Sequence, residues 1–578
     1  MRSVGVLAAV FALVLAPSAL ARAHANPLGV TVVRFAHGTS PAAMRAAVER
    51  AGGTVVSDLS RIDALAVVSS SSAFRARIGA SSDVTAAFKE SVLGTSRVPD
   101  AGDGSGQGGD GELDGSGGGF PDPWHDASSF WGVSNPEGIL QWDDNRMEVP
   151  AAWQTTTGDP SVRVAVLDSG VQSSHKELSQ VDTRSSENLI PCKELAAELG
   201  WAALKAAGLT DCGNGDEDGH GTWVASRIAG AANGFASNGV APRVKIVSYK
   251  VLAAGFGGLP SWIVAGLLDA CSSHVDLVNV SIGGYLDPTD PFDAQDYLLF
   301  TDAVDYCRAQ GVPVFAAAGN DHVRIDRATL DIGGRTVQGA GVVALDDAGI
   351  AATPPGADSL AGSNLRGLVE VPGGVPGVVM VSATANAIGA APSNVPLRWR
   401  LHVGARDQLA YYSNYGSRID LAAPGGARRY EIPFYDGGEG DLLYGGWGSL
   451  GAVAAGGDLC ATSGSPLTFA CFKSRGDGFG WLQGTSMSAP NAVGVAALTL
   501  SARPGLRGNP AALVARLEAK ARTSLANYVG PSDPSNFAPG LDGTPCATGF
   551  CHLDQADAIP FAQAYGAGLV DAGAAVGS

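Results

Sequence analysis

The chain has 578 residues, 45% of them hydrophobic and 16% charged, so it can bury a larger interior than one hydrophobic core usually serves. Its formal net charge of -18 and isoelectric point near 4.9 argue against a nucleic-acid partner, because phosphate binding needs clustered Lys and Arg. We therefore expect a large main domain with at least one smaller unit.

The amino-terminal segment, residues 1–25, has the pattern of a secretory signal peptide. Arg2 precedes an apolar run from Val4 to Leu15, and small residues follow up to Ala25. The run is shorter than the roughly 18–20 apolar residues that span a membrane, so we expect no transmembrane anchor. The sequence thus predicts a secreted protein, extracellular or periplasmic.

Export changes the interpretation of the eight cysteines. In an oxidising compartment an even number of cysteines indicates disulfides more often than a metal site. The favoured pairs are Cys192/Cys212, Cys271/Cys307, Cys460/Cys471 and Cys546/Cys551. A metal site at Cys546, Cys551 and His552 is the alternative, but it lacks a convincing fourth ligand.

Residues 26–97 are predicted to form a compact α+β unit, in the order strand, helix, strand pair, helix, strand. The first helix, over 40–53, has Ser40 as N-cap, Pro41 in its first turn and glycines at its end. Residues 98–123 then read as a flexible linker, because they are acidic, Gly-rich and poor in apolar anchors. The repeated Asp-Gly pairs could also bind calcium, but a regular period is missing.

Residues 124–578 alternate short apolar strands with helical stretches, as a parallel sheet covered by helices on both faces requires. The predicted strands include 162–170, 245–252, 276–284, 312–320 and 377–383. In such sheets the chemistry gathers at the carboxyl ends of the strands. Asp168, the segment 279–284 and Asn320 are therefore the places to look.

Three side chains along this domain form a possible catalytic set. Asp168 ends a strand, His220 opens a small-residue helix within EDGHGTWVAS, and Ser486 precedes an apolar helical run within GTSMSAP. Alone, each has a structural explanation: a turn residue, a helix-opening histidine, a small-residue turn. Together they supply a nucleophile, a base and a carboxylate that orients the base.

The motifs around these residues resemble, in order, those of the subtilisin-like serine proteases. The resemblance runs from about Gln141 to 576 and includes AVLDSGV, DGHGTWVAS, NVSIGG, AAAGN, PGVVMVSAT, YYSNYGSRIDLAAPG and GTSMSAP. It implies an α/β, subtilisin-like three-layer fold with a central mostly parallel sheet, preceded by a small α+β prodomain. It also implies a secreted serine endopeptidase that works through an acyl-enzyme and is made as a zymogen.

The resemblance assigns roles residue by residue. Ser486 would attack, His220 would move the proton, Asp168 would orient the imidazole, and Asn320 would donate to the oxyanion. Substrate would bind as an added strand along Gly257, Gly258, Ser281, Ile282, Gly283 and Gly284. Residues 26–97 resemble the family's inhibitor-like prodomain, and the linker is the natural place for its cleavage.

The remaining expectations concern partners and cofactors. Polypeptide substrates and the protein's own prodomain are the expected partners of a monomer, with no cofactor and no metal. The Asp-rich loop 287–296 could bind structural calcium, although a solvated acidic loop is favoured.

Several departures from the family pattern leave the specificity open. Trp223 replaces a frequent His, Ser488 replaces a usual Ala, and insertions at 321–370 and 424–479 fall where the primary-specificity pocket is completed. A catalytically inactive homologue acting as a binding protein is one alternative function, but the chain keeps all four catalytic residues. An α/β-hydrolase esterase is another, but the chain has no G-x-S-x-G motif.

Overall fold

The computed structural model describes residues 24–95, 141–234, 237–351, 363–385, 408–410, 412–426, 448–455, 471–474, 476–525 and 559–577. The predicted linker, nearly all of the predicted signal segment and the predicted pairs Cys460/Cys471 and Cys546/Cys551 lie outside the residues whose side chains are described. Within the described part, no helix is both long and apolar enough to cross a membrane.

The amino-terminal unit is an antiparallel sheet with two helices, in the predicted order. Its elements are β2 (Thr31–Phe35), α1 (Pro41–Ala51), β3 (Thr54–Leu59), η1 (Ser60–Ile62), β4 (Ala64–Val68), α2 (Phe74–Gly79) and β5 (Val84–Lys89). The strand order is β3-β4-β2-β5. Ser40 caps α1 by accepting from the Ala43 N–H at 3.3 Å, and Gly52 ends it in the left-handed conformation that glycine adopts without strain. The predicted capping signals are confirmed.

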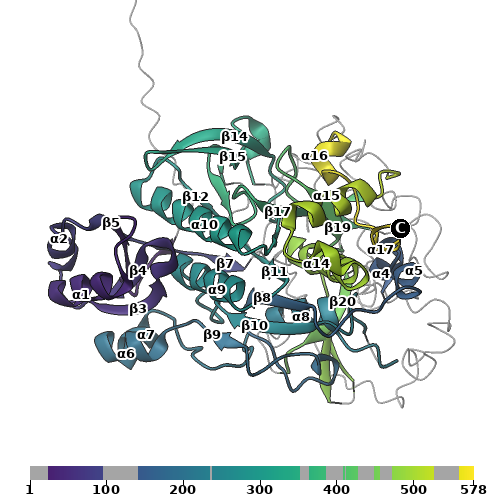
Figure 1. The fold of residues 1–578 in the computed structure, drawn as a ribbon, viewed down its shortest axis with the longest axis horizontal. Coiled ribbons are helices and arrows are strands. Elements are labelled where there is room, and N and C mark those ends of the chain that lie inside the picture. Colours follow the sequence, from purple (N-terminus) through teal and green to yellow (C-terminus); the bar gives the residue numbers. More distant parts are fainter. Residues whose placement is uncertain are drawn as a thin grey trace, which may run out of the picture.

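One very short strand precedes this unit in the chain, and two follow it. They are β1 (His24–Ala25), β6 (Ser91–Val92) and β7 (Gly94–Thr95). β1 pairs with β6, whereas β7 leaves the unit and pairs with β12 (Ile282–Leu286) of the main domain. Figure 1 shows β7 reaching from the purple unit into the body of the protein.

The main domain is built on an eight-stranded sheet in the order β18-β17-β13-β11-β8-β10-β9, with β19 also paired to β17. Its strands are β8 (Arg163–Asp168), β9 (Glu187–Asn188), β10 (Lys245–Lys250), β11 (Leu277–Val280), β13 (Val314–Ala317), β17 (Val378–Ala385), β18 (Gln408–Leu409) and β19 (Leu421–Pro424). Every pairing is parallel except that of β18 with β17. The predicted parallel sheet is confirmed.

Helices cover both faces of this sheet. Along β8, Ala165 and Leu167 pack toward α9 (Pro260–Ser272) and α10 (Pro291–Ala309), because alternate residues of a strand point to opposite faces. Val164 and Val166 pack toward α8 (His220–Ala229) and α14 (Thr485–Ala502). The result is the predicted three-layer α/β arrangement, with α9 and α10 on the side of the amino-terminal unit (Figure 1).

Shorter elements complete the main domain. They are α4 (Trp142–Arg146), α5 (Val149–Trp153), η2 (Lys176–Leu178), α6 (Cys192–Leu199), α7 (Trp201–Ala206), η3 (Asp347–Gly349), η6 (Pro504–Leu506), α15 (Pro510–Lys520), α16 (Phe561–Tyr565) and α17 (Ala572–Val576).

The two insertions occupy different places. The first forms the hairpin β14 (Ile325–Ile332) and β15 (Arg335–Val343) and ends in β16 (Val369–Val371), which pairs with β12. The second contributes β20 (Ser449–Val453), β21 (Cys471–Ser474) and β22 (Asp477–Leu482). β20 packs against α8, and the Gly480 carbonyl of β22 accepts from the Trp223 indole N–H at 3.0 Å. β21 pairs along the other edge of β22. The described part of the second insertion therefore packs against the helix that begins at His220.

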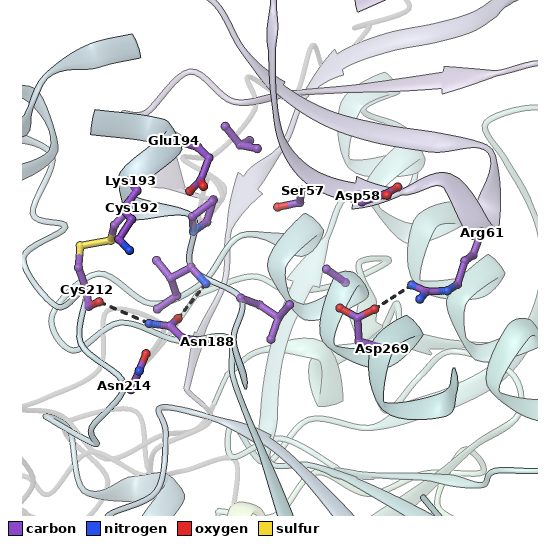
Figure 2. A pocket seen from close by; sticks show the side chains of 15 residues that line it. Ser57, Asp58, Arg61, Asn188, Cys192, Lys193, Glu194, Cys212, Asn214 and Asp269 are labelled. Atoms are coloured by element: carbon purple, nitrogen blue, oxygen red, sulfur yellow. Dashed lines mark hydrogen bonds and ion pairs between the residues drawn. A yellow bond between two sulfur atoms is a disulfide. The ribbon is translucent and has the colours of Figure 1, made fainter. Parts of the chain in front are cut away.

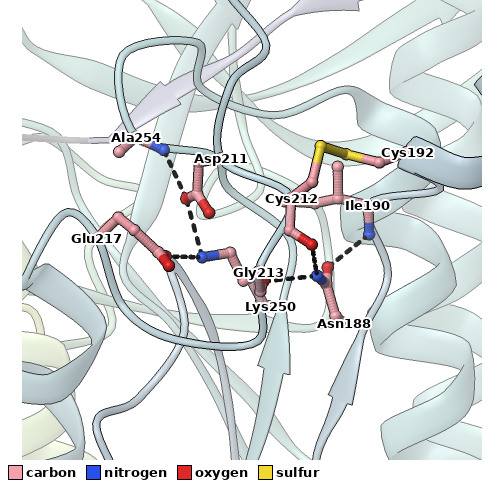
Figure 3. The surroundings of a disulfide bond; sticks show 9 residues. All are labelled: Asn188, Ile190, Cys192, Asp211, Cys212, Gly213, Glu217, Lys250 and Ala254. Atoms are coloured by element: carbon pink, nitrogen blue, oxygen red, sulfur yellow. Dashed lines mark hydrogen bonds and ion pairs between the residues drawn. A yellow bond between two sulfur atoms is a disulfide. The ribbon is translucent and has the colours of Figure 1, made fainter. Parts of the chain in front are cut away.

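Two of the predicted disulfides are formed, Cys192–Cys212 and Cys271–Cys307. The second joins α9 to α10 beneath the sheet. The first closes the segment that holds α6 and α7, which we call the disulfide arm (residues 192–212). Figure 3 shows its bond beside the buried Lys250 ammonium, which pairs with Asp211 at 2.8 Å and Glu217 at 2.7 Å. The arm is thus fixed to the end of β10.

Candidate active site

The carboxyl ends of the central strands bring the predicted site residues together. Asp168 is the last residue of β8, Ser281 lies between β11 and β12, and Asn320 lies three residues after β13. All three side chains are buried. Because these strands are parallel neighbours, residues more than 100 positions apart in the chain reach one edge of the sheet.

His220 and Asp168 form the first pair of the site. Nδ1 of His220 lies 2.8 Å from Oδ1 of Asp168, and both side chains are at most 2% exposed. A carboxylate only accepts, so this contact puts the imidazole proton on Nδ1. Within the described residues Nε2 has no hydrogen-bond partner. The ring is thus oriented with its basic nitrogen available.

Asp216 holds the first turn of α8 and was missed by the sequence analysis. Its carboxylate accepts from the backbone N–H groups of Gly219 and Thr222, and from the hydroxyls of Thr222 and Ser169. Two of these donors are amides of a helix start, which have no partner inside the helix. Burial raises the pKa of Asp216, and the four donors oppose that rise. The signal for this role was an Asp three residues before the helix N-cap Gly219.

Ser486 is the second residue of α14, and its first turn is shaped by Pro490. Proline has no N–H to donate to the Ser486 carbonyl four residues earlier. That carbonyl accepts instead from the Ser281 hydroxyl at 2.9 Å, while the Ser486 hydroxyl donates to the Ser281 carbonyl at 3.2 Å. The proline therefore frees a carbonyl through which α14 is bound to the end of β11.

Asn320 is oriented by the residue before Ser486. Its Oδ1 accepts from both the backbone N–H and the hydroxyl of Thr485, each at 2.8 Å. This pairing fixes which end of the amide is oxygen, so Nδ2 is directed away from Thr485. Thr485 in turn accepts from the Gly319 N–H at 3.1 Å. Thr485, which the sequence analysis did not single out, therefore sets the direction of the amide that Asn320 can offer.

The predicted substrate strands have the chain's own residues 93–95 between them. On one side, Leu93 and Gly258 exchange two backbone hydrogen bonds of 2.7 Å. On the other, β7 pairs antiparallel with β12, placing Gly94 opposite Gly283 and Thr95 opposite Ile282. An extended segment added to exposed strand edges is how a protease site can hold a peptide. The segment runs toward Ser281, which contacts Ser486.

The glycines predicted to line the substrate differ in what they contact. A Cβ on Gly284 would lie 2.9 Å from Cδ2 of Leu93, so the missing side chain makes room for this leucine, which is 3% exposed. Gly257 has its backbone paired with Ala253 inside its own loop rather than with residues 93–95. Gly258, Ile282, Gly283 and Gly284 therefore contact the segment, and Gly257 shapes the loop beside it.

Buried carboxyl groups join the amino-terminal unit to α9 and α10. Glu90 accepts from the N–H and hydroxyl of Ser261, in the first turn of α9, both at 2.8 Å. Asp296 of α10 accepts from the Ser91 N–H at 3.0 Å, and Asp293 from the Ser91 hydroxyl at 2.9 Å. Burial raises the pKa of Glu90 to about 8, and burial together with the nearby Glu90 raises that of Asp296.

The disulfide arm and the amino-terminal unit border a pocket of about 470 Å³. Figure 2 shows Ser57, Asp58 and Arg61 of the unit facing Asn188 and Cys192, with Arg61 paired to Asp269 of α9 at 2.8 Å. The pocket is open and mostly polar, and it lies on the contact between the two parts rather than beside His220 or Ser486. It marks incomplete packing at the edge of this interface.

The acidic loop before α10 uses its carboxylates locally. Asp287 accepts from Thr289, Asp290 caps α10 through Phe292 and Asp293, and Asp293 accepts from the Asp287 N–H. In the described ranges, no group of three or more His, Cys, Asp or Glu side chains is arranged to hold a metal ion. These carboxylates therefore serve as turn and helix caps.

Comparison with known proteins identifies the family. The model of the subtilase family, peptidases of type S8, matches residues 159–540, so this chain belongs to the subtilases. Subtilisin E of Bacillus subtilis is 31% identical over 188 residues, and the match covers 32% of this chain and 40% of subtilisin E. An epidermin leader peptide-processing serine protease of Staphylococcus epidermidis is 27% identical over 202 residues, with the same coverage.

Solved structures agree on the fold. The epidermin leader peptide processing serine protease of Staphylococcus aureus superposes with a TM-score of 0.59 at 17% identity, covering 95% of this chain and 97% of the other. Fervidolysin of Fervidobacterium pennivorans, a keratinolytic enzyme related to subtilisin, gives 0.53 at 17% identity, covering 95% of this chain and 60% of the other. The subtilisin-like fold predicted from the motifs is confirmed.

Proposed function

We propose that this protein is a secreted serine endopeptidase, made as a zymogen, that hydrolyses polypeptides with Asp168, His220 and Ser486. It needs no cofactor, and it works as a monomer outside the cytoplasm after loss of residues 1–25. Residues 26–97 act as an inhibitor-like prodomain. Family membership supports the class of reaction, and the pairing of His220 with Asp168 supports the roles of these two side chains.

The proposed reaction proceeds in two halves. The Ser486 hydroxyl oxygen bonds to the scissile carbonyl carbon while Nε2 of His220 takes the hydroxyl proton. The carbonyl oxygen becomes negative and accepts from the Asn320 amide and the Ser486 backbone N–H, at the start of α14. His220 then gives its proton to the leaving amine, and an acyl-enzyme remains. Water, deprotonated by His220, releases the acid and restores the Ser486 hydroxyl.

The observation that carries this proposal is the seating of Leu93, Gly94 and Thr95. A substrate must present main chain to the edges at Gly258 and at β12, and this segment does so from the prodomain side of the chain. Nonspecific packing would not require mutual backbone hydrogen bonds on both sides. The segment has the form of a bound peptide, so the prodomain can inhibit by occupying the site.

The pairing of β7 with β12 also suggests which peptide bond is cleaved when the precursor is processed. Residues 93, 94 and 95 precede Ser96 in the chain, and Ser281 precedes Ile282, the partner of Thr95. We infer that, in the reacting precursor, the ladder continues by one residue, so that Ser96 would face Ser281, whose carbonyl contacts the Ser486 hydroxyl. We therefore expect cleavage between Ser96 and Arg97, just before the linker. Amino-terminal sequencing of the mature protein tests this, and a mature chain that begins within 100–123 would contradict it.

Two serines that lie two residues apart provide the decisive experiment. Ser486→Ala should remove peptidase activity and leave an unprocessed precursor, since it deletes the attacking oxygen. Ser488→Ala is the matched control: its hydroxyl donates to the Thr485 carbonyl inside the helix, at 2.8 Å. That variant should process itself and retain activity. Cleavage of peptides by purified Ser486→Ala would refute the proposed mechanism.

A further inference from the structure

The space for one substrate side chain is bounded by two elements of the site. In the proposed reaction, the residue before the scissile bond, P1, has its carbonyl carbon at Ser486 and its oxygen at Asn320. Its N–H faces the Ser281 carbonyl, as the ladder along β12 requires. The P1 side chain is thereby directed into the space between β12 and residues 318–320. The largest P1 side chain that fits depends on which protein side chains already fill that space.

Tyr285 of β12 crosses this space. Its hydroxyl donates to Oδ2 of Asp321 at 2.6 Å and accepts from Nδ2 of Asn414 at 2.8 Å. Asp321 directly follows Asn320, and the same Asn414 nitrogen donates to the Ala318 carbonyl at 2.8 Å. The backbone of Tyr285 is therefore part of β12, and its hydroxyl is held by hydrogen bonds to Asp321 and Asn414 on the other side of the space.

The depth of the space is limited by the same contacts. The ideal Cβ position of Gly319 lies 3.4 Å from the Tyr285 hydroxyl and 2.3 Å from Nδ2 of Asn414. The phenol thus reaches Gly319 itself, and Asn414, which is fully buried, supports it from behind. Asn414 also accepts from the Asp321 and Val323 N–H groups at 3.2 and 3.0 Å, so it cannot turn aside without breaking these bonds.

Acidic groups nearby do not make this space a site for a basic side chain. Glu370 lies opposite Tyr285 in β16 and is 1% exposed. Its burial raises the pKa of its carboxyl group well above the ordinary value, which disfavours the negative charge that would attract a basic side chain. Asp321 accepts from the phenol. What can then distinguish one side chain from another is the room that Tyr285 leaves beside Gly319.

We propose that Tyr285 is a specificity-determining residue that restricts P1 to small side chains such as Ser, Ala and Gly. This inference rests on the proposed function. It is consistent with the proposed processing bond, at which Ser96, a small residue, would be P1. Leu93, three residues earlier, is the large apolar side chain that the enzyme buries.

The test uses wild-type mature enzyme and four peptides, Leu-Gly-Thr-Xaa with a fluorogenic leaving group, in which Xaa is Ser, Ala, Phe or Arg. We expect kcat/KM for Ser and Ala to exceed that for Phe and Arg by at least about tenfold, within the range that side-chain size can provide in a tight pocket. Equal rates for Phe and Ser would overturn the proposal. Cleavage of none of the peptides, with no labelling of Ser486 by a sulfonyl fluoride, would instead refute the proposed function.

Two variants test whether Tyr285 limits the size of the P1 side chain or only supports residues 318–320. Tyr285→Ala should raise kcat/KM for the Phe peptide at least about tenfold relative to the Ser peptide. Tyr285→Phe keeps the ring but removes both hydroxyl contacts, so it should keep the preference for small P1 residues. An equal loss for all four peptides in Tyr285→Ala, with wild-type selectivity in the remaining activity, would assign the tyrosine a structural role only.

The precursor supplies an independent readout. Ser96→Phe should slow processing at the Ser96–Arg97 bond, and adding Tyr285→Ala should restore it, because the space made by one change accepts the side chain added by the other. Ser96→Ala is the matched control and should be processed at the wild-type rate. Normal processing of Ser96→Phe in the presence of Tyr285 would contradict the proposal.

Discussion

Asp216 shows how one residue away from the proposed reaction can determine the position of His220, the proposed catalytic base. Its carboxylate gathers two amides and two hydroxyls around the first turn of α8, where His220 is the first residue. The imidazole can reach Asp168 only if that turn is held in place. The precision of the His220–Asp168 contact therefore depends on a carboxylate that touches neither side chain.

Asp216→Asn tests this dependence. An amide nitrogen would replace one accepting oxygen and face donors, so the variant should lose about 1 kcal/mol of unfolding free energy, as when a helix cap is removed. Its kcat should fall more than its KM rises, because substrate main chain binds elsewhere. Thermal unfolding and steady-state kinetics measure the two effects. Asp218→Asn, which alters the 3.2 Å contact to the His220 N–H, is the control and should change both less.

At the scale of elements, the two disulfides have different neighbours. Cys271–Cys307 links α9 to α10 within the main core. Cys192–Cys212 closes the disulfide arm, whose Glu198 accepts from the Ser70 N–H of the amino-terminal unit at 2.9 Å and from the Thr54 hydroxyl at 3.4 Å. We therefore expect the first bond to stabilise the main domain and the second to hold its contact with the amino-terminal unit.

Replacing each cysteine pair by serines should separate these roles. Loss of Cys271–Cys307 should cost the mature enzyme about 2–4 kcal/mol of unfolding free energy. Loss of Cys192–Cys212 should affect the mature enzyme less but should speed release of the cleaved prodomain. Thermal unfolding of inhibited enzyme and the time course of activation measure the two. Equal destabilisation of the mature enzyme by both replacements would show that the arm is part of the core.

The elements were predictable from sequence where a local pattern carries them. Apolar runs ending in polar residues predicted the parallel strands, and Ser40 with Pro41 predicted the start of α1. The disulfide arm's contact with the amino-terminal unit has no local signal, because Glu198 and Ser70 are 128 residues apart. Nor did the pattern show that the second insertion packs against α8.

The residues of the candidate site also fall into those that the sequence could predict and those that it could not. Asp168, His220, Asn320 and Ser486 lie in long motifs, so the amino-acid sequence alone is enough to propose them as the reacting residues. Thr485 and Tyr285 act through contacts to Asn320 and Asp321, which only the folded chain brings near. Gly257 was predicted to line the substrate strand, but pairing with Ala253 uses its backbone in the loop. A motif identifies reacting residues, whereas packing determines their supports.

At the scale of the whole molecule, the main feature is the contact between the amino-terminal unit, which we propose to be a prodomain, and the main domain. Residues 94 and 95 pair with β12, the proposed substrate edge, while Arg61 pairs with Asp269 and Arg34 pairs with Asp302 of α10. At this contact, however, Glu90 lies buried near the buried Asp296, which also lies near the half-buried Asp293. Burying neighbouring carboxyl groups is favourable only while some of them remain protonated. The strength of the contact should therefore depend on pH.

The direction of this dependence follows from the raised pKa values. Glu90 has a pKa of about 8 when it is buried at the contact, against an ordinary value of 4.5 once the prodomain is released. The associated form therefore binds more protons between these two values. Prodomain affinity should be highest at the acidic end and should fall as pH rises toward about 8, by at most roughly tenfold per pH unit for one group.

Activation kinetics of the processed but still associated precursor test this dependence. The rate at which activity appears, corrected for the pH dependence of the free enzyme, should rise between about pH 5 and 8 in wild type. Glu90→Gln keeps the shape and a carbonyl that accepts from Ser261, yet it cannot ionise, so its activation rate should be much less sensitive to pH. Glu49→Gln makes the same chemical change at an exposed prodomain position and should behave as wild type. If Glu90→Gln and wild type gave parallel pH profiles, the protons that control release would have to belong to other groups, with Asp296 and Asp293 as the next candidates for the same replacement by amides.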